Sequence, residues 1–80
     1  MSTGYSLRLR DSNAEADKRK LGVRLGRICI EQGVPVAVVA KAMGVTRATV
    51  YNWFAGASAP QPVVSSSIEL FIANLENSAV

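Results

Sequence analysis

The side chains best suited to specific hydrogen bonding lie close together between residues 46 and 55. Arg47 offers a fork of donors that matches guanine O6 and N7, and Asn52 can pair with adenine N6 and N7. Ala48 is small enough to let a backbone approach closely or to meet a thymine methyl group. Because these ten positions include no acidic residue, their exposed surface suits a groove lined by phosphates.

Other kinds of chemistry have little support in the residue types present. The chain has no histidine and a single cysteine, Cys29, so the usual nitrogen and sulfur ligands of a metal site are missing. A glycine-rich phosphate loop and a pair of carboxylates in a plausible pocket are also missing. We therefore expect no enzymatic activity, no small-molecule substrate, no metal and no cofactor, and we expect Cys29 to be a small core residue.

Length and composition indicate one small folded domain. Of the 80 residues, 49% are hydrophobic, which favours a packed core over disorder. No apolar run approaches the roughly 20 residues that span a bilayer, and no signal-peptide pattern opens the chain, so we expect a cytoplasmic protein without membrane contact. The net charge is +3, and every Lys and Arg except Lys41 and Arg47 lies within residues 8–27. Such a basic third suits phosphates, although solvated helix faces carry similar charges.

Two short helices joined by a glycine turn are predicted over residues 36–55. Gly44 permits the left-handed backbone that turns the chain, and Thr46 can accept hydrogen bonds from the free N–H groups of the second helix. Helical spacing gives these inward residues: Val36, Val39, Ala40, Met43, Val45, Val50, Trp53 and Phe54. The outward residues of the second helix are Arg47, Ala48, Tyr51 and Asn52, with Thr49 at the edge.

A longer helix is predicted before this pair, over residues 13–32, with Ser12 and Glu15 forming a capping box at its start. Its core face holds Leu21, Leu25, Ile28 and Cys29. Val23 and Ile30 lie opposite, with Gly26 between them, and indicate a second buried surface. A separate basic stripe consists of Lys20, Arg24 and Arg27.

The two ends of the chain have different patterns. Residues 5–10 alternate apolar and polar side chains, as a strand does. Residues 1–12 are therefore expected to pair across a dimer, pack over the helices, or remain a basic arm. A last helix is predicted over residues 62–76 with the core stripe Val64, Ile68, Phe71, Ile72 and Leu75. The outer side of this helix, with Val63, Leu70 and Ala73, is too apolar for free solvent. The domain is thus expected at residues 13–77, with a tail at 78–80.

These residues resemble the helix-turn-helix proteins of the lambda repressor and Cro superfamily, also called the XRE family. That family has a small residue midway along the first helix of the motif, a glycine in the turn, and apolar residues after it. The matching positions here are Ala40, Gly44, Val45, Val50 and Trp53. The family's tryptophan, glycine and proline spacing continues in Trp53, Gly56 and Pro60. The likeness covers about residues 20–60, and residues 45–75 are also similar to the phage CII-type activators.

The resemblance implies an all-α fold, a compact lambda-repressor-like bundle of four to five helices with a short extended or flexible N-terminal segment. It implies a regulator of transcription, repressor or activator, of phage or bacterial origin, that binds specific double-stranded DNA. At the matching positions, the resemblance implies base contacts from Arg47, Ala48 and Asn52 and phosphate contacts from Thr46 and Thr49. For Tyr51 it implies a contact to either a base or the backbone. Further phosphate contacts are expected from Lys20, Arg24, Arg27, Lys41 and Ser58.

A homodimer on a palindromic operator is expected, because one recognition helix contacts few base pairs and two-fold proteins use half-sites about 34 Å apart. Three self-association surfaces are available: Val23 with Ile30, Leu7 with Leu9, and Val63 with Leu70 and Ala73, of which we favour the last.

Some positions depart from the family pattern and favour a different function. Pro35 and Val36 replace the family's helix cap and its phosphate-anchoring glutamine, and Phe54, Ala55 and Ala57 replace polar or basic residues. The alternative is a protein-interaction module, an antirepressor or polymerase inhibitor that keeps the fold without binding DNA.

Overall fold

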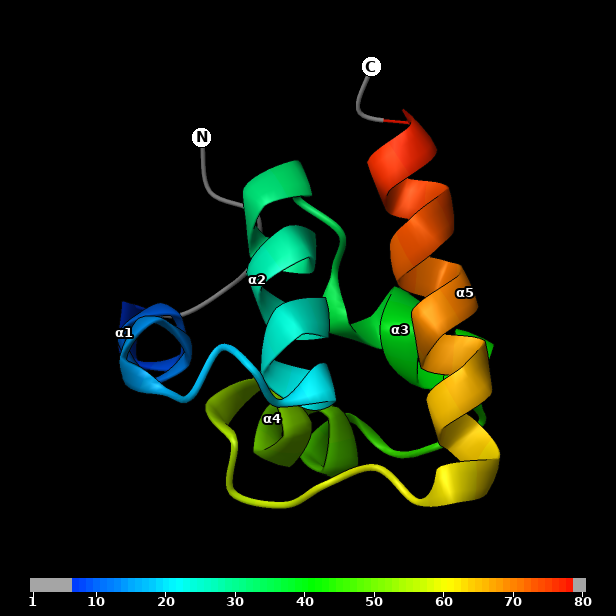
Figure 1. Ribbon diagram of the computed structural model, residues 1–80. Coiled ribbons are helices and arrows are strands. Elements are labelled where there is room, and N and C mark those ends of the chain that lie inside the picture. Colours follow the sequence, from blue (N-terminus) through cyan, green and yellow to red (C-terminus); the bar gives the residue numbers. More distant parts are fainter. Residues whose placement is uncertain (1–6, 79–80) are drawn as a thin grey trace.

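The computed structural model describes residues 7–78, which form five α-helices and no strand in that range (Figure 1). The helices are α1 (Leu7–Glu15), α2 (Leu21–Gln32), α3 (Val36–Met43), α4 (Arg47–Ala55) and α5 (Pro62–Ser78). α2 and α5 stand side by side, α4 lies across the N-terminal end of α2, and α1 flanks α2 and α4 (Figure 1). The predicted all-α bundle is confirmed.

α3 and α4 form the predicted helix-turn-helix. Gly44 ends α3 with φ of 70°, in the left-handed region, which glycine adopts without a Cβ penalty. The N–H of Gly44 donates to the carbonyl of Lys41 at 3.3 Å, and the N–H of Val45 donates to that of Ala40 at 3.0 Å. These bonds satisfy carbonyls that the end of α3 would otherwise leave unpaired.

The core lies between α2, α3, α4 and α5. Its fully buried side chains include Leu25 of α2, Val39 of α3, Val50 and Phe54 of α4, and Ile68 of α5. The other predicted core residues of these helices are buried or partly buried against the same cluster. Burial of Cys29 raises the pKa of its thiol to about 12, because a thiolate would lose its hydration there. Cys29 is therefore an unreactive core residue, as the sequence predicts.

The backbones of α2 and α4 approach each other closely at two glycines of α2. A Cβ on Gly22 would lie 2.8 Å from Cβ of Trp53, and one on Gly26 would lie 2.7 Å from Cγ of Phe54. The second buried surface predicted around Gly26 is confirmed in part, since Val23 is fully buried and Ile30 is partly buried. However, α1 and α4 of the same chain cover it, so the proposal that Val23 contacts a second copy is wrong.

The N-terminal predictions need correction. Residues 7–10 begin α1 rather than a strand, while Tyr5 and Ser6 lie outside the described residues. The helix places Leu9 and Asn13, four residues apart, on one face, where Asn13 is buried and Leu9 packs against the core. A lone strand would have no partner for its backbone groups. The expected boundary between arm and domain, at residues 12–13, therefore falls inside a helix.

The single helix predicted over residues 13–32 is also wrong, and so is the capping box, because Ser12 lies inside α1. Asp17 breaks the helix: its carboxylate accepts the N–H of Arg19 at 2.9 Å, a local bond that competes with helical pairing. The N–H of Lys20 donates to the carbonyl of Asp17 at 3.0 Å and closes the turn. α2 then begins at Leu21.

At the other end, the predicted C-terminal helix over residues 62–76 is confirmed as α5, which continues to Ser78, the first residue of the expected tail. Of its core stripe, Ile68 and Ile72 are buried, while Val64, Phe71 and Leu75 are partly buried against the core. Within the described range, no helix combines the length and apolar character needed to cross a membrane.

Replacing Gly26 with alanine should destabilise the fold by about 1–3 kcal/mol, because the added methyl group overlaps the ring of Phe54 and the amide of Asn13. The sign of this change in the free energy of unfolding tests the close packing, since alanine normally stabilises a helix interior by up to about 1 kcal/mol relative to glycine. Urea unfolding measures the change. Gly44→Asn is the control, because asparagine tolerates the left-handed region and no atom lies within 4 Å of an added Cβ there.

Candidate nucleic-acid interface

The first turn of α4 is fixed by a side-chain cap. Thr46 precedes the helix in an extended conformation, and its hydroxyl accepts the N–H of Thr49 at 3.2 Å. The hydroxyls of Thr46 and Thr49 also lie 3.0 Å apart in a hydrogen bond. The predicted capping role of Thr46 is therefore confirmed, and these contacts hold the exposed start of α4 in one geometry.

One face of α4 is buried and the opposite face is open. Val50, Trp53 and Phe54, at three- and four-residue spacing, pack beneath α2. The exposed side carries Arg47, Ala48, Tyr51 and Asn52, with Thr49 half-buried at its edge. The structure therefore brings all the predicted base-contacting residues onto one surface, which points away from α2.

This α4 surface has the polarity that nucleic acid requires. Arg47 is the one charged residue of α4. Within residues 7–78, no hydrogen bond or ion pair occupies the side chains of Arg47 and Asn52, so both are available to a ligand. Tyr51 is 44% exposed, with its phenol free of the core. A cation, an amide and a phenol on an open helix provide donors for base edges and phosphates.

Two side chains from the opposite end of the chain hold the C-terminal end of α4. Asn13 donates from Nδ2 to the carbonyl of Phe54 at 2.8 Å and to that of Val23 at 3.1 Å. Lys20 donates from Nζ to the carbonyl of Gly56 at 3.1 Å. Asn13 is the buried polar residue of the described range, and sequence reasoning missed it. No periodic pattern marks it, since its partners are backbone carbonyls distant in the chain.

The residues predicted to contact phosphates do not form a single surface. Lys20 and Ser58 flank the C-terminal end of α4, and Ser58 lines a small pocket with Thr49 and Trp53. Lys41 is exposed on α3. Arg24 and Arg27 lie farther along α2, where they line a groove with Lys18.

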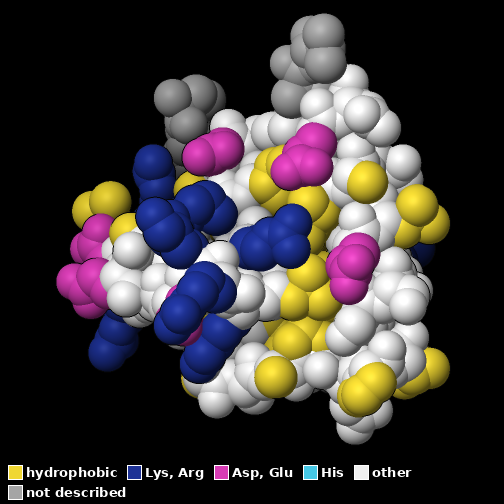
Figure 2. Space-filling view, viewed as in Figure 1, with side chains coloured by type: hydrophobic (Ala, Val, Ile, Leu, Met, Phe, Trp, Pro, Cys, Tyr) yellow, Lys and Arg dark blue, Asp and Glu magenta, His cyan; other side chains and the backbone are white. Residues whose placement is uncertain are grey.

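Arg27 is already engaged within the chain. Its guanidinium donates to the carbonyls of Asn13 at 3.0 Å and Ala14 at 3.3 Å, both at the C-terminal end of α1. A cation is favourable at that end of a helix. Arg27 thus has a structural role that the sequence pattern does not reveal. Figure 2 shows Lys and Arg side chains gathered on the side of the molecule formed by α1 and α2.

The turn before α2 contains an exposed ion pair. The guanidinium of Arg19 lies 3.1 Å from the carboxylate of Asp17. Its hydrogen bonds hold the pKa of Asp17 below the ordinary value, and the same contact raises the pKa of Arg19. Such a pair is solvent-screened and contributes little to stability. Among the described residues, no group of three or more potential ligands could hold a metal ion.

The residues expected to make dimer contacts on α5 lie open in the single chain. Val63 is 79% exposed and Leu70 is 64% exposed, and Ala73 is also exposed. Leu7, from another of the expected surfaces, is 74% exposed at the start of α1.

Comparison with known proteins assigns the chain to a family. Residues 13–60 match the family described as a homeodomain-like domain. The matched stretch runs from Asn13 through α2, α3 and α4 to the loop before α5. No curated protein and no solved structure matches the chain. The match supports the helix-turn-helix class that the residue pattern predicts, without selecting the lambda repressor and Cro branch.

Replacing Thr46 with alanine should destabilise the protein by about 1 kcal/mol, because the N–H of Thr49 loses its acceptor. Thr46→Ser retains the hydroxyl and should stay within a few tenths of a kcal/mol of the unmodified protein. Chemical unfolding of both variants measures the difference. Equal stability of the alanine and serine variants would show that the cap contributes nothing.

Proposed function

Because the chain belongs to the homeodomain-like helix-turn-helix family, whose members bind DNA, we propose that it is a transcriptional regulator that recognises a specific double-stranded sequence. α4 enters the major groove with its exposed surface toward the bases. The observation that carries the proposal is that surface itself, with Arg47 and Asn52 open and no acidic side chain on the helix. The protein acts in the cytoplasm of a bacterium or on behalf of a phage, and no step of this function is enzymatic.

Within α4 we assign sequence recognition to Arg47 and Asn52, with Ala48 against the groove floor. A guanidinium that bridges guanine O6 and N7, or an amide on adenine, discriminates against other bases by about 1–3 kcal/mol. Thr46, Thr49 and Tyr51 position the helix on the backbone. Lys20 and Ser58 contribute phosphate contacts at the C-terminal end of α4, and Lys41 contributes one from α3.

We further propose that the protein acts as a homodimer on a palindromic operator, in the manner of the lambda repressor and Cro branch. α4 has nine residues, and one such helix contacts too few base pairs to select a site in a genome. Two copies related by a two-fold axis contact half-sites about 34 Å apart. The exposure of Val63, Leu70 and Ala73 on the outer side of α5 supports the proposal that this helix makes the dimer contact.

One observation favours the alternative of a protein-interaction module that does not bind DNA. Val36, where the resemblance implies a phosphate-anchoring glutamine, is 8% exposed. Its side chain belongs to the core, so the first turn of α3 offers no polar side chain there for a phosphate. Direct binding experiments separate the two functions.

Selection of bound sequences from a random duplex pool should yield a palindromic consensus, because a two-fold dimer contacts two equal half-sites. The centres of the half-sites should lie about 10 base pairs apart, or a multiple of that spacing. Sequencing of the bound fraction measures both features. A pool that stays random would favour the interaction module, and a single non-repeated site would contradict the dimer alone.

Replacing Arg47 with alanine should weaken binding to the selected site by roughly 10- to 100-fold while changing binding to random duplex only slightly, since one base-contacting group is lost. Titrations at several salt concentrations measure both affinities. For the unmodified protein the logarithm of the affinity should fall linearly with the logarithm of salt concentration. Arg10→Ala, which removes an exposed arginine of α1, is the matched control. Equal losses on both duplexes would mean that Arg47 contacts phosphate.

A further inference from the structure

A single buried amide joins three helices at the C-terminal end of α4. Asn13 is the buried residue of α1, and the Nδ2 group of an asparagine carries two N–H donors. It donates to the carbonyl of Val23, in the first turn of α2, at 3.1 Å and to that of Phe54, in the last turn of α4, at 2.8 Å. These two hydrogen bonds form the Asn13 bridge, which ties α1, α2 and α4 together.

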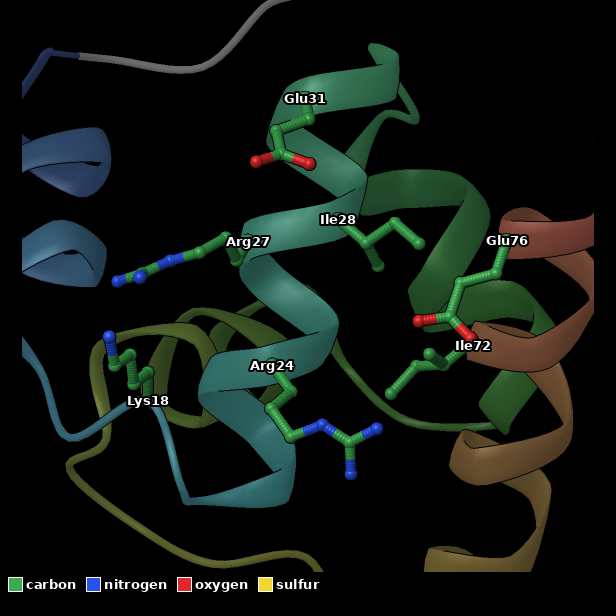
Figure 3. A pocket seen from close by; sticks show the side chains of 7 residues that line it. All are labelled: Lys18, Arg24, Arg27, Ile28, Glu31, Ile72 and Glu76. Carbon is green, nitrogen blue, oxygen red and sulfur yellow. The ribbon is translucent and has the colours of Figure 1, made fainter. Parts of the chain in front are cut away.

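α1 is itself held in place by a cation of α2. The guanidinium of Arg27 donates to the carbonyls of Asn13 at 3.0 Å and Ala14 at 3.3 Å. In Figure 3 Arg27 points from α2 toward α1, whereas Arg24, one turn earlier, points away from α1. Leu9 of α1 also packs against the core. The backbone that carries the Asn13 amide is therefore fixed relative to α2.

The two ends of α4 are held by different parts of the chain. At the start, the local turn and the Thr46 cap fix the backbone next to Arg47. At the other end, the carbonyl of Phe54 accepts a hydrogen bond of the bridge, and the carbonyl of Asn52 accepts the N–H of Ala57 at 2.9 Å. Asn52 thus lies in the turn of α4 that the bridge holds.

On the basis of the proposed DNA-binding function, we propose that Asn13 is a positioning residue for sequence recognition. Through α4 it sets the preference for the base that Asn52 contacts, and it does not contact DNA itself. The local turn sets the position of Arg47 independently. A recognition contact needs its side chain placed to within about 0.5 Å, so a small movement of the last turn of α4 changes the preference at Asn52 first.

The chemistry of the bridge suits this role better than apolar packing would. Hydrogen bonds are directional, so acceptors on two different helices fix the orientation of α4 as well as its distance from α2. Gly26 leaves the space for the amide, because a Cβ added there would lie 2.6 Å from Nδ2 of Asn13. A buried polar group with all its partners rigidifies the structure around it. Leucine would fill the same space without fixing a direction.

The location of Asn13 separates positioning from direct contact with DNA. Its side chain is 3% exposed and reaches α4 from the side that packs on α2, whereas Arg47 and Asn52 lie on the exposed surface of α4. Lys20 also donates to this end of α4, at the carbonyl of Gly56, but its side chain is exposed and is proposed to contact phosphate. Asn13 is therefore the residue at which positioning is tested alone.

Asn13→Leu tests the bridge without DNA, because leucine has the same branched shape and no donor. Hydrogen exchange measured by NMR should be about tenfold faster at the amides of Gly56 and Ala57, which close the end of α4, beyond the effect of any global loss of stability. Urea unfolding measures that global loss. The amides of Thr49 and Val50, at the start of α4, should change only by the global amount.

Three further variants separate positioning from general weakening. Ile72→Val removes a buried methyl group of α5 and lowers stability, so its exchange rates should rise evenly along the chain. Arg27→Lys keeps the charge but loses the planar fork that bonds the α1 carbonyls, and it should speed exchange at the end of α4 by a smaller factor. This variant answers the question if Asn13→Leu does not fold. Arg24→Lys is the matched change on the side of α2 away from α1 and should leave exchange in α4 unaltered.

Base preference is measured on the duplex that the unmodified protein selects. Selections with Asn52→Ala and Arg47→Ala identify the base pair that each side chain contacts, because its preference is lost. Titrations of duplexes substituted at one of these base pairs then give the discrimination. Asn13→Leu should lower it by about fivefold or more at the Asn52 base pair and by less than about twofold at the Arg47 base pair. Ile72→Val should lower neither.

Each other result overturns a defined step. Unchanged exchange at the end of α4 in Asn13→Leu, or an even rise like that of Ile72→Val, would show that the bridge does not position α4. Faster exchange there with equal losses of discrimination at both base pairs, or with none, contradicts the role in base preference. Failure of the unmodified protein to bind any duplex contradicts the proposed function and this role with it, while the exchange rates still decide whether Asn13 positions α4.

Discussion

The close packing of α2 against α4 is the constraint on which the other elements depend. At Gly22 and Gly26 the two backbones leave no room for a Cβ, so the orientation of α4 is fixed by the surface of α2. The carbonyl of Phe54, at the buried end of α4, would lose its hydration in this contact, and Asn13 supplies the donor at 2.8 Å. α1 is therefore required by the packing, because it delivers that amide. The exposed surface of α4 faces outward as a consequence.

The helix-turn-helix could be predicted because its determinants are local. Gly44 needs a left-handed backbone, Thr46 caps the next helix, and the spacing of Val50, Trp53 and Phe54 fixes which side is buried. The N-terminal region could not be predicted in the same way. The alternation of Leu7 and Leu9 suits a strand, and Ser12 with Glu15 imitates a capping box. Helix α1 is favoured by Asn13, whose bonds to Val23 and Phe54 span ten and forty-one positions of the chain.

The basic stripe of α2 shows a second limit on what can be predicted from the sequence. Helical spacing places Lys20, Arg24 and Arg27 in one direction from α2, but it does not say what lies in that direction. Each side chain has different neighbours: the end of α4 for Lys20, the groove beside Ile72 for Arg24, and the end of α1 for Arg27. Three residues that look equivalent in sequence therefore have three roles. The surroundings of the exposed α4 residues can be predicted from sequence, because an exposed position on a helix with one buried face has solvent as its neighbour.

The buried part of α5 has a consequence for where the folding unit ends. The family match stops at residue 60, yet Ile68 and Ile72 complete the core from the far side of the following loop. The match also begins at residue 13, in the middle of α1. A fragment cut to the matched residues would expose Leu25 and Val39 to water and leave Asn13 without its helix. The matched segment is thus smaller than the packed unit of this chain, which needs all of α1 and α5.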